Sequence, residues 1–179
     1  MARQDDCLIW MDLEMTGLDP ERHTIMEIGA AVTDSELQLI AESPAIAVYQ
    51  SEAVLAGMDS WCVEHHGKSG LTERCRNSRI SMSEAETKIL EFVKGYAEPD
   101  SSPLCGNSVG QDRRFLVKYM PDLHNFFHYR NLDVSTIKEL VRRWYPLLAP
   151  FEKKGTHHVL DDIRESIDEL RHYRKAVFR

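Results

Sequence analysis

The sequence contains no hydrophobic run long enough to cross a membrane, and its first residues do not have the pattern expected of a signal peptide. No segment approaches the ~20 apolar residues that a membrane-spanning helix needs. Residues 1–12 place acidic residues before a short apolar run and lack the basic region and long apolar stretch of a signal peptide. We therefore expect a cytoplasmic protein with no membrane partner.

Paired cysteines and an excess of basic residues are also missing. The four cysteines are scattered and form no C-x-x-C pair, so we interpret them as reduced cytosolic thiols. The net charge is −7, and a protein of this charge repels a polyanion and should bind long duplex nucleic acid poorly. A nucleic-acid substrate would have to be short or reach a bound cation.

The first half of the sequence is rich in predicted strands. A near-continuous apolar run from Cys7 to Asp12 predicts a strand buried on both faces of a sheet. Three further strands are expected, at Ile25–Thr33, Leu37–Glu42 and Ala45–Tyr49. The length favours a single domain over residues 1–179, with none to spare for an appended RNA-binding module.

Helical periodicity dominates the second half. Ser83 and Glu86 form a capping-box pattern, which predicts a helix over Ser83–Ala97. The elements expected after it are a short strand around Leu104 and helices at Ser108–Met120, Thr136–Trp144 and Leu160–Val177. Strands followed by alternating strands and helices predict an α/β fold, in which a mixed β-sheet is flanked by α-helices.

Asp12 and Glu14 form the first candidate site, at the end of the buried run. Side chains two residues apart in a strand face the same side, so these two carboxylates project together. They repel each other unless a cation lies between them. A D-x-E pair is nevertheless common, and taken alone it indicates an ordinary strand end more often than a site.

Asp112 is the second candidate, because it lies within the apolar face of a predicted helix. At about 100° per residue, it falls on the face that carries Phe115 and Leu116. The segment allows two interpretations, a functional carboxylate or a buried aspartate satisfied by a neighbouring arginine or backbone amide. Arg113 and Arg114 point away from this face, which weakens the second interpretation.

The start of the last predicted helix carries a pair of histidines and a pair of aspartates. Asp162 lies about 100° from the centre of the apolar face and can line a cleft at the edge of the core. Asp161 lies about 160° away and should be solvated or act as an N-terminal helix charge. An isolated pair such as His157 and His158 belongs to a surface loop more often than to a catalytic site.

Together these segments suit one chemistry. Hydrolysis of a phosphodiester by two divalent ions needs several carboxylates that converge around metals ~3.5–4 Å apart, and a base for the attacking water. Either histidine could supply the base, and oxygen-rich ligation favours Mg²⁺ or Mn²⁺ over zinc. The carboxylates that could supply the ligands are Asp12, Glu14, Asp112 and Asp162.

The order of these residues resembles the DEDD exonucleases, in the subfamily with a histidine five residues before the last aspartate. The positions that match are Asp12, Glu14, Asp112, His157 and Asp162. Val159 stands where alanine is usual in the last motif, H-x-A-x-x-D. Longer stretches, spanning nearly the full chain, are similar to the oligoribonuclease family: IWMDLEMTGLDPERHTIMEI, CGNSVGQDRRFLVKYMP, HYRNLDVST and LDDIRESIDELRHYR.

This resemblance implies a ribonuclease H-like fold, a homodimer, and 3′→5′ hydrolysis of short RNA oligomers and dinucleotides to 5′-mononucleotides. It also implies two divalent ions. Asp12, Glu14 and Asp162 would bind the first, with Asp12 shared. Asp112 would serve the second, partly through water, and His157 would deprotonate the attacking water.

The resemblance further implies a substrate site. Leu18 and Trp61 would grip the two bases, although Trp61 alone would read as an ordinary half-buried aromatic. The residues expected to close over the 5′ phosphate are His66, Ser108 and Ser135, with Tyr129 and Arg130 reaching the neighbouring subunit's site.

Two other functions remain open. One is another DEDD exonuclease that acts on longer chains, such as a proofreading or tRNA-trimming enzyme. The other is a nucleotide-binding or signalling module that kept the pocket but lost catalysis. The acidic balance and the missing RNA-binding extension argue against the first, and the five motif residues argue against the second.

Overall fold

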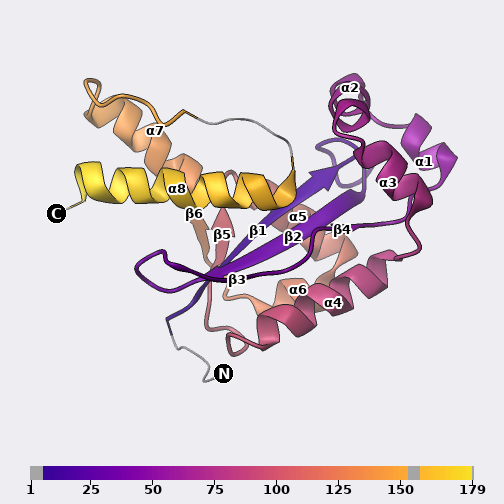
Figure 1. The fold of residues 1–179 in the computed structure, drawn as a ribbon, viewed down its shortest axis with the longest axis horizontal. Helices are drawn as coiled ribbons and strands as arrows, with labels where there is room; N and C mark the ends of the chain where they lie inside the picture. Colours follow the sequence, from indigo (N-terminus) through magenta and orange to yellow (C-terminus); the bar gives the residue numbers. More distant parts are fainter. Residues whose placement is uncertain (1–5, 153–157, 179) are drawn as a thin grey trace.

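A mixed β-sheet forms the centre of the protein, with helices on both faces (Figure 1). The structure, a computed structural model, describes residues 6–152 and 158–178. The strands are β1 (Leu8–Met15), β2 (Ile25–Thr33), β3 (Leu39–Glu42), β4 (Ile46–Ala47), β5 (Leu104–Gly106) and β6 (Asn131–Asp133). Their order in the sheet is β3-β2-β1-β5-β6, with β4 also paired to β2. The predicted mixed sheet flanked by helices is confirmed.

Strand β1 lies in the middle of the sheet, which explains its nearly continuous apolar sequence. It pairs antiparallel with β2 and parallel with β5, so both of its edges are hydrogen-bonded to neighbouring strands. Ile9 and Met11 belong to the core on one face, and Trp10 belongs to the core on the other. The strand continues beyond Asp12 to Met15, so Asp12 and Glu14 lie within the strand.

Eight helices surround the sheet in the part of the chain that the structure describes. They are α1 (Glu52–Ala56), α2 (Ser60–Lys68), α3 (Leu71–Asn77), α4 (Met82–Lys94), α5 (Gly110–Tyr119), α6 (Pro121–Phe126), α7 (Val134–Trp144) and α8 (Val159–Val177). Residues of α4, α5 and α6 pack on one face of the sheet, and residues of α7 and α8 pack on the other (Figure 1). Within 6–152 and 158–178, every helix is too short or too polar to cross a membrane.

Several predicted boundaries differ from the observed ones, two of them for clear local reasons. Strand β3 begins at Leu39 because the residues before it form a turn, in which Leu37 has a φ of 67°. The Asp34 carboxylate stabilises this turn by accepting hydrogen bonds from the backbone N–H groups of Glu36 and Gln38. Helix α4 begins earlier than predicted, because its capping box uses Ser81 and Glu84 and not Ser83 and Glu86. Strand β4 covers only Ile46–Ala47 of its predicted range, and α4 ends at Lys94.

The sequence patterns missed the helices between β4 and α4, and also α6 and β6. Helix α2 buries only Cys62 and His66, so it has no apolar stripe for periodicity to detect. Its start is marked by Asp59, whose carboxylate accepts a hydrogen bond from the Cys62 backbone N–H at 2.8 Å. This helix matters here because it carries Trp61 and His66.

The capping box tests where α4 begins. Ser81 Oγ accepts a hydrogen bond from the Glu84 backbone N–H, and Glu84 Oε2 accepts one from the Ser81 backbone N–H. Ser81→Ala should lower the free energy of unfolding by about 1 kcal/mol, as loss of an N-cap side chain does, in urea denaturation. Ser83→Ala is the matched control, and equal losses from the two variants would contradict the assignment.

Candidate active site

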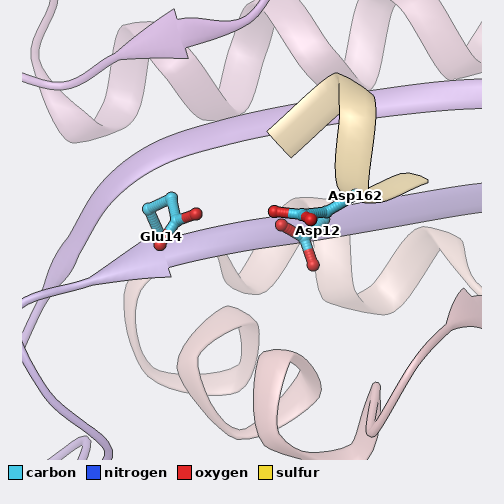
Figure 2. Close-up of side chains that lie close together, drawn as sticks. All are labelled: Asp12, Glu14 and Asp162. Carbon is cyan, nitrogen blue, oxygen red and sulfur yellow. The ribbon is translucent and has the colours of Figure 1, made fainter. Parts of the chain in front are cut away.

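Asp12, Glu14 and Asp162 bring their carboxylates together at one point above the sheet. One oxygen of each lies within 4.8 Å of the corresponding oxygens of the other two. Asp12 and Glu14 lie on β1, and Asp162 reaches toward Asp12 from the first turns of α8 (Figure 2). A group of carboxylate oxygens at this spacing fits a hard divalent cation. The three residues therefore form a cluster that can bind a metal ion.

The approach of α8 to the sheet depends on Gly29. This glycine pairs with Asp12 across β1 and β2. A Cβ atom at Gly29 would lie 2.9 Å from Val159 Cγ2 and 3.0 Å from Leu160 Cδ2, which is closer than side-chain atoms pack. The first turn of α8 thus rests on the bare backbone at the position where β2 faces Asp12, and this brings Asp162 within reach.

Asp112 is buried at the start of α5 and lies outside the three-carboxylate cluster. Its Oδ1 accepts a hydrogen bond from the Leu13 backbone N–H at 3.0 Å. This amide lies beyond the paired register of β1 with β5, which covers Ile9 and Trp10. Of the alternatives open from the sequence, satisfaction by a backbone amide is confirmed for this oxygen, and the same bond fixes Asp112 beside β1.

The arginine alternative for Asp112 finds no support in its neighbour. The Arg113 guanidinium donates to Asn131 Oδ1 at 2.7 Å and to the backbone oxygens of His128 and Arg130. Arg113 therefore binds the segment before β6, and the Asp112 carboxylate lies near the three-carboxylate cluster without a contact to Arg113.

The carboxylates of this region cannot all be ionised at neutral pH without a cation. Burial, first of all, and then the nearby carboxylates of Asp162, Glu27 and Asp112 together raise the pKa of Glu14 from 4.5 to about 8. Burial also raises the pKa of Asp112, to about 7. Such a concentration of disfavoured negative charge is typical of a site that binds cations.

Glu27 is a member of this electrostatic environment that sequence reasoning missed. It pairs with Glu14 across β1 and β2, and its side chain is buried. Arg74 of α3 donates to Glu27 Oε1 at 2.8 Å. The strand pattern places Glu27 in β2, but only the register of β1 against β2 places it beside Glu14.

A cavity of about 390 Å³ adjoins Glu14. Leu18 and Trp61, the residues expected to grip bases, both line it and are 68% and 52% exposed. Gln111 Nε2 donates to the Leu18 backbone oxygen at 2.5 Å, and the Trp61 ring stacks on His65 with centroids 3.8 Å apart. The cavity thus offers two exposed apolar surfaces next to the acidic cluster.

His66 of α2 lines the same cavity. Its Nε2 lies 2.8 Å from the Met15 carbonyl oxygen, which can only accept, so Nε2 carries the proton. Nδ1 lies 3.8 Å from Glu14 Oε2, and burial lowers the pKa of His66, which favours the neutral ring. The structure places His66 with Leu18 and Trp61, and its expected contact with a phosphate stays a prediction.

Ser108 and Ser135 meet at a shared aspartate. Asp133 Oδ1 accepts hydrogen bonds from the Ser108 backbone N–H at 2.9 Å and from Ser135 N and Oγ at 3.0 and 2.7 Å. Asp133 is the N-cap of α7, a role that an aspartate before a helix often takes. The structure therefore brings together two of the residues expected to bind a phosphate, and it adds Asp133 as the residue that joins them.

Tyr129 and Arg130 lie at the surface just before β6. Tyr129 is 72% exposed, and the Arg130 guanidinium lies 5.2 Å from the centroid of its ring. This pair projects a cation and an aromatic ring outward, so its expected role in a neighbouring subunit's site stays a prediction.

Of the two histidines near the last motif, His158 alone lies within the described residues. His157, the expected general base, lies outside the described residues. His158 occupies the N-cap position of α8.

Asp161 lies away from the apolar face of α8, as its position on the predicted helix indicates. It forms an ion pair with Arg164 at 2.8 Å.

Comparison with known proteins identifies close relatives. The family model described as "Exonuclease" matches residues 9–170. The oligoribonuclease of Marinobacter nauticus is 60% identical over 175 residues, which cover 97% of this chain and 97% of that protein. The oligoribonuclease of Vibrio parahaemolyticus is 58% identical over 180 residues, which cover 100% of this chain and 99% of that protein.

Solved structures share the fold at much lower identity. Exonuclease I of Methylocaldum szegediense superposes with a TM-score of 0.73 at 19% identity, covering 96% of this chain and 41% of that chain. The zinc-bound E. coli exonuclease I in complex with single-stranded DNA gives 0.77 at 14% identity, covering 98% and 42%. This chain thus spans about two fifths of those enzymes, and the likeness confirms the predicted ribonuclease H-like fold.

The contact between Gly29 and Val159 gives a test of how α8 is positioned. Val159 is β-branched and stiff in a helix, so a methyl group at residue 29 should push the helix away. Gly29→Ala should destabilise the protein by about 1–3 kcal/mol, as overpacking does, and should weaken Mn²⁺ binding in calorimetric titration. Val159→Ala removes the obstructing Cγ2, so the double variant should recover most of both losses. Independent, additive effects of the two substitutions would contradict this packing.

The raised pKa values predict how stability depends on pH when metal is absent. Glu14 and Asp112 have folded-state pKa values of about 8 and about 7, above their ordinary values. Their contribution to stability is therefore fully present below the unfolded-state pKa values of 4.5 and 3.8, falls as pH rises above them, and is lost once pH reaches about 7 to 8. In EDTA, the thermal midpoint should fall over this range, and Mn²⁺ should oppose the fall. Glu14→Gln should flatten the EDTA profile, and an unchanged profile would show that other groups cause it.

Proposed function

Because this chain belongs to the oligoribonuclease family of exonucleases, we propose that it hydrolyses RNA oligomers of a few nucleotides, dinucleotides above all, in the cytoplasm. Hydrolysis would run from the 3′ end and release 5′-mononucleotides. The observation that carries the proposal is the cluster of Asp12, Glu14 and Asp162 beside the cavity of Leu18 and Trp61. The cluster would bind a cation that contacts the phosphodiester group, and the cavity would bind the bases on either side of it.

The carboxylates would bind two divalent ions, and Mg²⁺ or Mn²⁺ suits them because every donor in the set is a hard oxygen. Asp12, Glu14 and Asp162 would hold one ion, and Asp112 would serve the second with Asp12 shared. When bound, the ions neutralise charge that develops on the phosphoryl oxygens and make water more acidic. Asp112 would be kept in place for this role by its hydrogen bond from the Leu13 amide.

His157 would act as the general base. It would take a proton from the water that attacks phosphorus, while the bond between phosphorus and the ribose 3′ oxygen breaks and that oxygen gains a proton from solvent. The proposal rests on the spacing of His157, five residues before Asp162. A positioned base of this kind contributes about 10²–10⁴-fold to the rate.

A small, enclosed site would select short substrates. The net charge of −7 does not provide a broad basic surface for a long backbone, so affinity must come from the pocket itself. Stacking on Trp61 can contribute about 1–3 kcal/mol for one base without regard to sequence, and Leu18 would offer an apolar contact to the other.

The end of the substrate would be held by a phosphate cap. His66, Ser108 and Ser135 would contact the 5′ phosphate, with the partner's Tyr129 and the partner's Arg130 completing the cap in a homodimer. Charge-assisted hydrogen bonds favour a terminal phosphate, whereas a continuing chain would collide with the groups that make them.

Substrate length and metal dependence test the proposal together. Purified protein with Mn²⁺ should cleave 5′-labelled RNA dinucleotides far faster, per 3′ end, than chains of about twenty nucleotides, because the cap closes behind a short substrate. Excess EDTA, or Asp112→Ala with folding intact, should abolish the activity. Equal rates on short and long RNAs would favour an exonuclease of longer chains, and full activity in EDTA would exclude the metal mechanism.

The two histidines can be separated by substitution. His157→Ala should lower kcat by about 10²–10⁴-fold and leave calorimetric Mn²⁺ binding largely intact, because the histidine moves a proton and the carboxylates hold the metal. His158→Ala is the matched control and should retain most of the activity. A large loss from His158→Ala alone would assign the base to the other histidine.

A further inference from the structure

Glu169 is a fully buried carboxylate that the proposed chemistry does not use. It lies on α8, about two turns after Asp162, and its exposed fraction is 0%. Its Oε2 accepts a hydrogen bond from Asn107 Nδ2 at 2.9 Å, and its Oε1 accepts one from the Tyr173 hydroxyl at 2.9 Å. Lys138 of α7 places its Nζ 3.6 Å from Oε1. A buried charge is thus surrounded by donors.

Asn107 connects this carboxylate to the loop between β5 and α5. Its Nδ2 also donates to Ser166 Oγ at 3.1 Å, and the Ser166 hydroxyl donates to the Asp162 backbone oxygen at 2.8 Å. The side-chain amide has two protons and uses both on α8. The loop is therefore joined to α8 at Glu169 and, through Ser166, to the backbone of Asp162.

The two elements joined by Asn107 carry opposite sides of the site. Helix α8 carries Asp162, and the loop leads through Ser108 into α5 with Asp112. The end of β5, from which this loop starts, packs closely on β1, since a Cβ at Gly106 would lie 2.9 Å from the Met11 backbone oxygen, next to Asp12. A shift of the loop relative to α8 would therefore change the separation of Asp162 and Asp112.

We propose that Asn107 and Glu169 are positioning residues, which hold α8 and the loop before α5 at the separation that the metal-binding carboxylates need. This inference rests on the proposed metal-dependent hydrolysis. Stability alone does not explain the pair, because well-packed apolar residues of similar volume stabilise a core as well as or better than a buried ionic group. A hydrogen-bonded network adds one defined geometry, since only one arrangement satisfies every donor and acceptor.

The groups around Glu169 are consistent with this geometry. Burial raises the pKa of Tyr173, and its hydrogen bond to Glu169 adds to the effect, so the phenol stays protonated and donates. Lys138 is half-exposed and supplies a positive charge from the solvent side. Asn107 supplies the donor from the side of the loop.

Reversing the direction of one hydrogen bond tests the proposal. Asn107→Asp places a second carboxylate against Glu169, so it should raise the Kd for Mn²⁺ at least tenfold and lower kcat on a 5′-phosphorylated dinucleotide more than it changes KM. Adding Glu169→Gln returns a donor to the pair, now pointing from residue 169 to residue 107. The double variant restores the link to residue 169 but not the one to Ser166 Oγ, so it should recover part of the Mn²⁺ affinity and of kcat.

A variant elsewhere in the core separates positioning from stability. Thr33→Val removes the partner of Trp10 Nε1, a buried hydrogen bond of 3.0 Å at the far end of β1. It should lower the thermal midpoint without changing the Kd for Mn²⁺. If Asn107→Asp does not fold, Asn107→Ser, which keeps one donor, replaces it and should show a smaller change in the same direction.

These measurements distinguish a failure of the positioning role from a failure of the proposed function. Wild-type enzyme that binds Mn²⁺ and hydrolyses dinucleotides, with Asn107 variants that lose only thermal stability as Thr33→Val does, overturns the positioning role and leaves the proposed function in place. Loss of Mn²⁺ affinity without recovery in the double variant also overturns it. Wild-type protein that neither binds Mn²⁺ nor hydrolyses RNA overturns the proposed function itself.

Discussion

Repulsion between partly buried carboxylates is the constraint on which the rest of this structure depends. Asp12, Glu14 and Asp162 have oxygens within 4.8 Å of one another, and burial with neighbouring charges raises the pKa of Glu14 to about 8. A fold does not hold such groups together for stability, because each one disfavours the ionisation of the next. A cation that binds the cluster would attract all three carboxylates. The repulsion that destabilises the protein without a cation therefore contributes to the affinity of the site for one.

The surrounding fold holds the carboxylates in place by close packing and by polar contacts. Gly29 lets the first turn of α8 rest directly on β2, and Gly106 lets the end of β5 lie close against the backbone of β1. Asp112 is held by the Leu13 amide, which lies beyond the paired register with β5. The cavity beside the site depends on the carboxyl end of β1 as well, because Glu14 belongs to the three-carboxylate cluster and also lines the cavity.

Local sequence patterns were sufficient for the elements whose stability is local or whose faces differ strongly. The apolar run in β1 and the amphipathic faces of α5, α7 and α8 predicted their elements to within a few residues. Helix α2 was missed because it buries only Cys62 and His66, and its folding depends on packing against α3 and on the cap at Asp59. The capping residue of α4 was placed two residues late, at Ser83, because two overlapping capping-box patterns occur, and only the backbone geometry selects Ser81.

The sequence by itself determined the chemistry of the site, since the residue types at Asp12, Glu14, Asp112 and Asp162 and their order along the chain already indicate oxygen ligands for divalent ions. Strand alternation also put Asp12 and Glu14 on one face, because that relation is local. Only the tertiary structure decided which groups meet. Glu27 lies beside Glu14 through strand register, and Asn107 reaches Glu169 through contact of a loop with α8. Such contacts join residues far apart in the chain, and their distances depend on the packing of whole elements, which no local pattern encodes.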